Sequence, residues 1–288
     1  MQKANPKRKL RRAQKQERPG LELKMNPKPI SDTPKAGSGK LKDKIALITG
    51  GDSGIGKAVA LLFAKEGADI ALAYLNEEAD ALETKNIIET QYGRRCLLLP
   101  YDISKERNCM QVVQKTISKF GRIDVLVNNA GMHYERKSLN EISSPEMIQT
   151  FATNVFSIFW ITSQALLHMK KGAVIVNTAS VTAYRGSSTL IDYASTKGAI
   201  VSFTRSLSAN LIEKGIRVNG VAPGPIWTPL IVSSFDPKKV SEFGSDVPMK
   251  RAGQPAEIAP CYLFFACDDS SYITGQFLHP NGGEIVNG

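Results

Sequence analysis

Tyr193 and Lys197 stand four positions apart, so on a helix they would share one face. A free tyrosine has a pKa of about 10, which is too high for a base at neutral pH. A cation beside the phenolate lowers that pKa, so the pair could give or take the hydroxyl proton of a substrate. Each residue also has a structural interpretation, since a lone Tyr more often serves packing and a lone Lys is more often a surface charge.

A glycine-rich segment, Thr49–Gly56, lies between a strand-like run and a helix-like pattern. Glycines let the chain turn tightly and let a pyrophosphate approach the backbone, while the N-terminus of the next helix supplies free N–H groups. The spacing G-x-x-x-G-x-G departs from the commoner G-x-G-x-x-G, and a glycine-rich turn alone is a weak signal. Its place between a strand and a helix predicts a dinucleotide-binding loop.

Strand-like and helix-like patterns alternate from Leu41 onward. The run Ile45–Thr49 is apolar, as a strand buried on both faces requires, and Ile55, Val59 and Leu62 recur at helical spacing. Further strands are expected at 69–74, 96–101, 124–128, 173–178, 217–222 and 276–279, and further helices at 78–91, 110–120, 144–170 (in one or two pieces), 200–211 and 254–266. This alternation predicts a single doubly wound α/β domain of Rossmann type, with helices on both faces of a parallel sheet. Ligands bind beyond the carboxyl ends of such strands.

The positive charge of the chain is concentrated at its start. Residues 1–40 hold twelve Lys or Arg, three Asp or Glu and no aromatic residue, a net charge of +9, whereas the rest carries +1. We therefore expect residues 1–40 to be a basic, largely irregular extension, disordered or draped over a domain of residues 41–288. The near-neutral body argues against a nucleic-acid-binding fold. The extension could bind nucleic acid, an anionic membrane or an acidic partner, but we favour a solvated arm.

Composition excludes several classes of protein. The 288 residues are 42% hydrophobic and 22% charged, as in ordinary globular proteins. Four cysteines without C-x-x-C spacing argue against a disulfide scaffold and a structural zinc site, and three scattered histidines argue against any metal site. No apolar run approaches the roughly 18 residues of a membrane span, and Met1–Leu10 lacks the apolar core of a secretory signal. We expect a cytoplasmic protein.

Further motifs follow the glycine loop in order. They are Asp102 after the third strand, Asn128-Asn129-Ala130-Gly131 after the fourth, then Asn154, Ser180, Tyr193-Ala194-Ser195-Thr196-Lys197 and Pro223-Gly224-Pro225-Ile226-Trp227-Thr228. With these motifs, the whole of Leu41–Gly288 resembles the short-chain dehydrogenase/reductase family. Through Pro19-Gly20 and Met25-Asn26-Pro27, the extension is similar to that of an N-terminally extended bacterial subgroup that includes stress-associated members.

The resemblance implies an NAD(P)-dependent oxidoreductase that interconverts an alcohol and a carbonyl by hydride transfer. It makes Tyr193 the general acid and base, and it has Ser180, 13 positions earlier, polarise the carbonyl. Lys197 would hold the nicotinamide ribose, and Asn154 would anchor a water-borne proton relay. Besides Tyr193 and Lys197, the cofactor-binding residues that it implies are Gly50, Asp52, Ser53, Gly54, Ile55, Gly56, Tyr74, Asp102, Ile103, Asn129, Ala130, Gly131, Pro223, Gly224, Ile226 and Thr228.

The end of the second strand bears on the choice between NAD and NADP. An acid about 20 residues past the loop would favour NAD through the ribose hydroxyls. Tyr74 stands there, followed by Leu75 and Asn76, so no Asp bars a 2′-phosphate. Equally, no Arg or Lys occupies Ser53 or Leu75, where relatives that use NADP often carry one. The cofactor is thus NAD or NADP, and we favour NAD.

Two later segments bear on substrate access and assembly. Trp227–Met249 is poorly periodic and rich in Pro and Ser, which predicts a substrate lid, with Trp227 and Phe235 lining the pocket or packing on a neighbouring subunit. Val155–Leu167 is apolar nearly all round, so it should be buried in the core or between subunits. The resemblance implies a dimer or tetramer, although Pro280 stands where relatives usually keep a β-branched residue.

Two functions therefore compete. One is the oxidoreductase, which acts on a small-molecule substrate that the sequence does not identify. The other is a non-enzymatic protein that senses a dinucleotide and uses the basic extension to hold an anionic partner. The complete proton-transfer set favours the enzyme.

Overall fold

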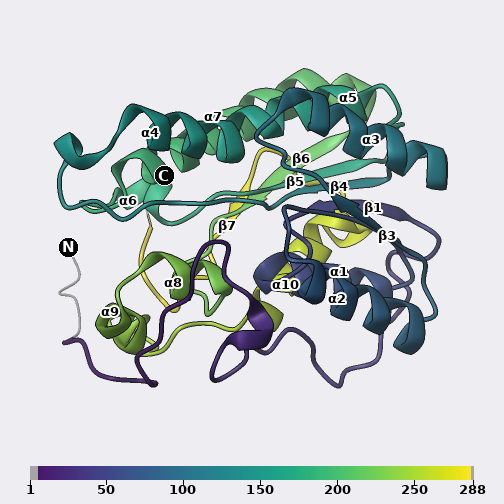
Figure 1. Ribbon diagram of the computed structural model, residues 1–288. Coiled ribbons are helices and arrows are strands. Elements are labelled where there is room, and N and C mark those ends of the chain that lie inside the picture. Colours follow the sequence, from purple (N-terminus) through teal and green to yellow (C-terminus); the bar gives the residue numbers. More distant parts are fainter. Residues whose placement is uncertain (1–5, 287–288) are drawn as a thin grey trace.

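A seven-stranded parallel sheet lies at the centre of the computed structural model, which describes residues 6–286 (Figure 1). The strand order is β3-β2-β1-β4-β5-β6-β7, so the order reverses between β1 and β4. The strands are β1 (Ile45–Thr49), β2 (Asp69–Tyr74), β3 (Cys96–Pro100), β4 (Val125–Asn128), β5 (Val174–Thr178), β6 (Arg217–Val221) and β7 (Phe277–Leu278). The predicted doubly wound, Rossmann-type fold is confirmed.

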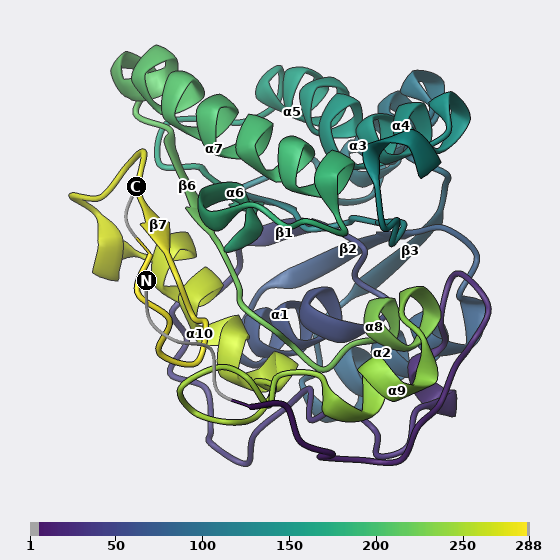
Figure 2. The same cartoon turned by 90° about the vertical axis from the view of Figure 1, so that its left-hand side faces the viewer.

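Helices cover both faces of the sheet (Figures 1 and 2). One face carries α1 (Gly54–Lys65), α2 (Glu78–Gln91) and α10 (Pro255–Ala266), and the other carries α3 (Glu106–Phe120), α4 (Ser144–Phe151), α5 (Ser157–Leu166) and α7 (Ile191–Leu211). Within β1, Ala46 and Ile48 join the core under α1 and α10, whereas Leu47 joins the core under α3 and α5. Successive side chains of a strand point to opposite faces, which explains why every residue of β1 is apolar or buried. Among residues 6–286, no helix is long and apolar enough to cross a membrane.

The helices differ from expectation in five places. Helices α3 and α7 begin at Glu106 and Ile191, before the apolar residues that mark them in the sequence. The expected helix 144–170 is interrupted by a π-helical turn, η3 (Ala152–Phe156), and ends at Leu166. The expected lid contains two short helices, α8 (Pro229–Ser234) and α9 (Pro237–Glu242), which begin with a proline whose fixed φ suits the first turn. Another short helix, α6 (Thr182–Arg185), follows β5. Short 3-10 turns complete the structure: η1 (Glu22–Lys24), η2 (Leu139–Glu141), η4 (Ile212–Lys214) and η5 (Asp268–Ser270).

Residues 6–33, here called the strap, lie along the body instead of extending into solvent (Figures 1 and 2). The Leu10 and Gln16 N–H groups donate to the carbonyls of Ser241 and Val232, at 2.8 and 2.9 Å. Met25 is buried in the apolar cluster that α8 and α9 form. Apart from η1, the strap has no regular element, as expected, but it is not the solvated arm that we favoured.

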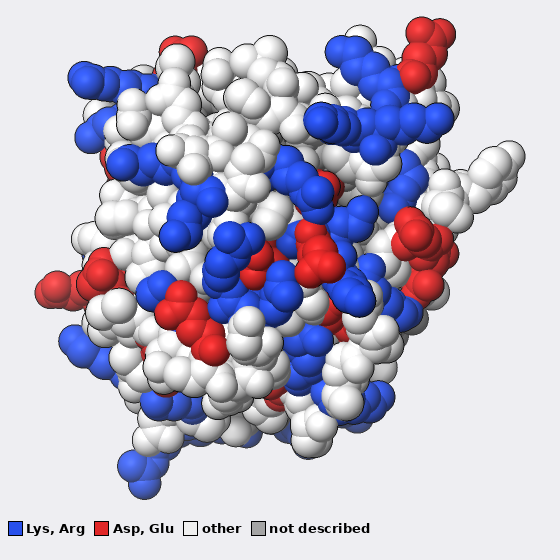
Figure 3. Space-filling model, turned by 90° about the vertical axis from the view of Figure 1, so that its right-hand side faces the viewer, with Lys and Arg blue, Asp and Glu red and all other residues white. Residues whose placement is uncertain are grey.

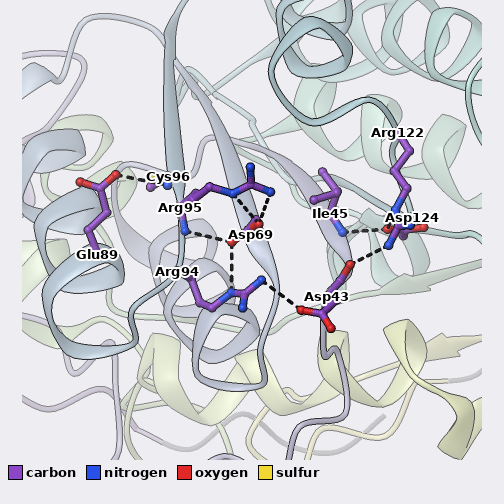
Figure 4. Close-up of polar contacts among 9 residues, drawn as sticks. All are labelled: Asp43, Ile45, Asp69, Glu89, Arg94, Arg95, Cys96, Arg122 and Asp124. Atoms are coloured by element: carbon purple, nitrogen blue, oxygen red, sulfur yellow. Dashed lines mark hydrogen bonds and ion pairs between the residues drawn. The ribbon is translucent and has the colours of Figure 1, made fainter.

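At the edge where the strands begin, charged groups are paired in a network around Asp69 (Figure 4). The Asp69 carboxylate is buried, accepts hydrogen bonds from the backbone and side chain of Arg95, and lies 3.0 Å from Nε of Arg94. The side of the molecule drawn in Figure 3 carries basic and acidic side chains next to one another. Burial alone would raise the pKa of Asp69, but the hydrogen bonds and the two guanidinium charges hold it below its usual value.

We expect Asp69→Asn to lower the free energy of unfolding at pH 7 by about 2 kcal/mol, because a neutral amide loses the charged hydrogen bonds from Arg95 and the ion pair with Arg94. The pKa of this carboxyl is lower in the folded state, so its stabilisation is present above the unfolded value of about 4 and is lost as pH falls through the folded value. The difference between parent and variant in urea unfolding should therefore shrink below pH 4. Asp43→Asn is the control, since Asp43 is exposed and 3.7 Å from Arg94; an equal loss in both variants would contradict the assignment.

Candidate active site

A cleft of about 1030 Å³ opens at the carboxyl edge of the sheet. This volume is at the top of the range of roughly 300–1,000 Å³ that small-molecule sites occupy. The predicted residues that line the cleft are Gly50, Asp52, Ser53, Gly54, Ile55, Tyr74, Asp102, Ile103, Asn129, Ala130, Gly131, Ser180, Tyr193, Lys197, Pro223, Gly224, Ile226 and Thr228. Two predicted residues, Gly56 and Asn154, are not part of its wall.

Helix α7 places Tyr193 and Lys197 one turn apart on the wall of the cleft. The Lys197 Nζ is 5.5 Å from the centre of the Tyr193 ring and donates a 2.8 Å hydrogen bond to the carbonyl of Thr178, the last residue of β5. Burial raises the pKa of Tyr193 to about 12, and hydrogen bonding with Ser180 partly opposes this rise. The phenol therefore holds its proton at neutral pH and is a proton donor in this state.

Lys197 is 2% exposed, and no carboxylate in the described part of the chain pairs with it. Burial lowers the pKa of Lys197 to about 7, because an unpaired ammonium loses its hydration there. Its cationic and neutral forms are then nearly balanced at neutral pH. A modest change in the charge inside the cleft can change which form is present.

Asn154 lies in the π-helical turn, behind the cleft wall, and is fully buried. Its Oδ1 accepts the N–H of Met132 at 2.8 Å, and its Nδ2 donates to the Met132 carbonyl and to Oγ1 of Thr196. The amide thus holds the loop after β4 against α7. Its role in a proton relay stays a prediction.

The glycine loop fits a pyrophosphate. A Cβ on Gly56 would lie 1.8 Å from the Gly50 carbonyl oxygen, so only glycine allows this close turn. Asn129 holds the loop from β4, since its Nδ2 donates to the carbonyls of Thr49 and Gly50. Within residues 6–286, the N–H groups of Ile55 and Gly56 at the start of α1 have no acceptor. Such N–H groups, at the positive end of a helix dipole, suit an anion.

The neighbouring N–H, that of Gly54, is occupied by a residue that the sequence analysis missed. Glu22 of the strap is 4% exposed, accepts this N–H at 2.7 Å through Oε2, and contacts Lys57 Nζ at 2.9 Å through Oε1. Its own N–H donates to Asp80 on α2. The strap thereby ties the starts of α1 and α2 together. No local pattern marks Glu22, because it lies 32 positions before Gly54.

Carboxylates surround the part of the cleft beside β2. Asp52 and Glu77 line it and are nearly buried, and the Tyr74 hydroxyl donates to Glu78. Burial, together with the charge of Glu77, raises the pKa of Asp52 to about 7. Glu77 was also not predicted from the sequence, because it follows Asn76, the last of the positions after β2 that were expected to bear on the choice of cofactor.

The opposite end of the cleft is formed by the loop after β4 and by the lid. His133 is 3% exposed, and its ring centre lies 5.1 Å from that of Tyr193 and 5.2 Å from that of Phe235. Burial, with nearby cations, lowers the pKa of His133 to about 3, so the imidazole is neutral. Phe235 lines the cleft as expected, but Trp227 packs under the strap and donates from Nε1 to the Pro27 carbonyl at 2.9 Å. Among the described residues, no group of three or more His, Cys, Asp or Glu could hold a metal ion.

Known proteins resemble this chain over most of its length. Residues 50–284 match the family model described as Enoyl-(Acyl carrier protein) reductase. The uncharacterized oxidoreductase YhxC of Bacillus subtilis (strain 168) is 56% identical over 286 residues, 99% of this chain and 100% of that protein. The NADPH-dependent aldehyde reductase 1, chloroplastic, of Arabidopsis thaliana is 54% identical over 276 residues, 93% of this chain and 96% of that protein.

Solved structures agree with these relatives. A short chain dehydrogenase from Burkholderia cenocepacia J2315 in complex with NADP has a TM-score of 0.80 and 30% identity, covering 85% of this chain and 98% of that one. A 3-ketoacyl-(acyl-carrier-protein) reductase from Brucella melitensis complexed with NADH has a TM-score of 0.76 and 32% identity, covering 84% and 98%.

The environment of Lys197 predicts how stability depends on pH. Its pKa is about 7 in the folded state and about 10.4 when unfolded, so between these values the unfolded chain binds more protons and this residue makes stability rise with pH. We expect Lys197→Met to be more stable than the parent at pH 7 and to lose about 3 kcal/mol of this advantage by pH 10. Urea unfolding at several pH values measures the effect. Lys42→Met, at an exposed position, is the control; a pH-independent difference for Lys197→Met would contradict the prediction.

Proposed function

We propose that this chain, which belongs to the short-chain dehydrogenase/reductase family and is an oxidoreductase, interconverts an alcohol and a carbonyl. Tyr193 would be the general acid and base. One observation carries the proposal. Tyr193, Lys197 and Ser180 line the same cleft as a glycine loop that fits a pyrophosphate. Nothing in the comparisons supports the alternative of a non-enzymatic dinucleotide sensor.

Its cofactor is NAD or NADP, as in the structural neighbours. The loop Gly50–Gly56 would hold the pyrophosphate, Asp102 and Ile103 the adenine, and Thr228 with Ile226 the carboxamide. Lys197 would hold the nicotinamide ribose. When bound, the dinucleotide supplies or accepts the hydride.

The side chains of the chain move the proton. In carbonyl reduction, Tyr193 donates its phenolic proton to the carbonyl oxygen while Ser180 donates a hydrogen bond to the same oxygen. The raised pKa of Tyr193 keeps the phenol protonated before the reaction. In alcohol oxidation, Tyr193 must first lose its proton, and the Lys197 ammonium stabilises the phenolate. The pair can therefore serve both directions.

We propose a preference for NAD over NADP. Asp52, Glu77 and Glu78 place carboxylates around the end of β2, and no Lys or Arg lines the described part of the cleft there. A 2′-phosphate would meet like charge, whereas free ribose hydroxyls can donate to a carboxylate. The Arabidopsis relative is an NADPH-dependent aldehyde reductase, so titration with both cofactors is the test of this preference.

We also propose a homo-oligomer, with residues 1–40 as an extension of a catalytic domain of residues 41–288. Phe156, the last residue of η3, and Phe159, on α5, are 43% and 51% exposed, although the segment Val155–Leu167 is nearly all apolar. An exposed aromatic surface of this kind fits contact between subunits better than contact with solvent.

Tyr193→Phe should lower kcat by roughly 10²- to 10⁴-fold, because the proton donor is lost while the ring is kept. The affinity for the dinucleotide should change little. Turnover is followed through nicotinamide absorbance, and binding through the fluorescence of the reduced cofactor. Tyr184→Phe, on α6 and outside the cleft wall, is the matched control. If Tyr193→Phe turned over as fast as the parent enzyme, that result would contradict the proposal.

Glu77→Gln should raise the affinity for NADP relative to NAD by roughly tenfold, since one like charge near the 2′-phosphate is removed. Fluorescence titration with NADH and NADPH measures both dissociation constants. Glu89→Gln is the control, because Glu89 is exposed and pairs with Lys85 away from the cleft. An unchanged ratio of the two constants would argue against a role of Glu77 in cofactor choice.

A further inference from the structure

The two ends of the cleft differ in the charged groups that line them. The end beside β2 is lined by the carboxyl groups of Asp52 and Glu77, and Glu78 accepts the hydroxyl of Tyr74, which also lines the cleft. At the other end, the charges that act on the buried imidazole of His133 are all positive, and they belong to Arg18, Lys239 and Lys197. Lys239 is paired with Glu135, and Lys197 is engaged beside Tyr193. Of these three cations, Arg18 is the one whose side chain has neither an ion pair nor a hydrogen bond within residues 6–286.

Arg18 comes from the strap and lines the cleft. Its guanidinium carbon lies 4.2 Å above the centre of the Tyr134 ring, next to His133. Within residues 6–286, no carboxylate is within ion-pair distance of Arg18, and no hydrogen bond engages its guanidinium. The other guanidinium near Tyr134, that of Arg136, is already neutralised by Glu146.

The strap holds Arg18 in place from both sides. On one side, the Gln16 N–H donates to the Val232 carbonyl on α8. On the other, Gly20 packs so closely that a Cβ there would lie 2.7 Å from the Pro229 carbonyl oxygen. The guanidinium lies over the Tyr134 ring, and within residues 6–286 no hydrogen bond uses its N–H groups. A guanidinium held in this way suits the two oxygens of a carboxylate or phosphate.

The acidic residues at the same end of the cleft as Arg18 have other partners or lie beside lysines. Asp236 accepts the N–H groups of Lys238 and Lys239 at the start of α9, and Glu284 pairs with Arg185. The remaining acidic residues of the lid that line the cleft, Glu242 and Asp246, share the rim with the cations Lys7 and Lys238. Among the described residues, Arg18 is thus a cation of the cleft wall that no carboxylate pairs with, beside Tyr134 and near His133.

We propose that Arg18 is a specificity-determining residue, which binds an anionic group, a carboxylate or phosphate, on the carbonyl or alcohol substrate. The substrate class is then a short aldehyde or ketone, or the matching alcohol, with a negative charge a few bonds from the reacting carbon. This inference rests on the proposed function, because it places the reacting carbon at Tyr193. The strap is accordingly part of the substrate site.

The test compares substrates that differ in charge, in the full-length enzyme with NADH and NADPH. One pair is butanal and succinic semialdehyde, and the other is glyceraldehyde and glyceraldehyde 3-phosphate. Arg18→Gln should lower kcat/KM for the anionic member by roughly 10- to 100-fold, mainly through KM, and leave the neutral member nearly unchanged. Arg18→Lys should restore part of the loss, and the pair with the larger effect identifies the anion.

Arg12→Gln is the matched control, because Arg12 is an exposed arginine of the strap that does not line the cleft. An equal effect of Arg18→Gln on neutral and anionic substrates, or no effect, would overturn the inference. So would a change confined to the ratio of NADP to NAD affinity, which would place the guanidinium at the cofactor.

Calorimetry separates this inference from the proposed function. Succinate and its neutral analogue succinamide are titrated into the parent and Arg18→Gln enzymes. Tighter binding of succinate by the parent, lost in the variant, supports the anion site even if none of the four aldehydes is reduced. That absence of turnover would count against the proposed function. Equal binding of both compounds by the parent would overturn the anion site, whatever the activity.

Discussion

All strands of the central sheet run in one direction, and this constraint decides where the chemistry of the molecule can lie. Because each pair of neighbouring strands is parallel, every loop that follows a strand opens at the same edge. The glycine loop after β1, the Asn129 loop after β4 and Ser180 after β5 meet there although they are far apart in sequence. The opposite edge holds paired charges around Asp69, which stabilise the fold.

At that edge of the sheet, the side-chain amino group of Lys197 is buried. Lys197 donates to a backbone carbonyl but has no counter-charge within residues 6–286, and burial lowers its pKa to about 7. A carboxylate beside it would remove this cost, and in the proposed mechanism it would also cancel the field that stabilises a phenolate on Tyr193. An unpaired buried charge is costly for stability and is typical of functional sites, which supports the proposed role of Lys197.

Much of this arrangement could be predicted from local pattern. The continuous apolar run at Ile45–Thr49 and the i, i+4 pair on α7 each report a periodicity, and periodicity depends only on neighbours in sequence. Glu22, Glu77 and the packing of Trp227 depend instead on which segments meet in space. Glu22 binds a loop 32 positions away, and Trp227 donates to Pro27 across 200 positions. A helix in two pieces was among the expectations for residues 144–170, but the π-helical form of the break at Asn154 depends on the contacts of Asn154 with Met132 and Thr196, which are distant in sequence.

The contacts between the strap and the lid join segments that are translated at very different times. Leu10 and Arg11 bind Ser241, Val240 and Phe243, so their partners leave the ribosome some 230 residues later. A growing chain can build β1, α1 and β2 early, but it cannot seat the strap until α8 and α9 exist. The mouth of the cleft is thus assembled near the end of synthesis, and the glycine loop can form long before Arg18 reaches the position at which we propose that it selects a substrate.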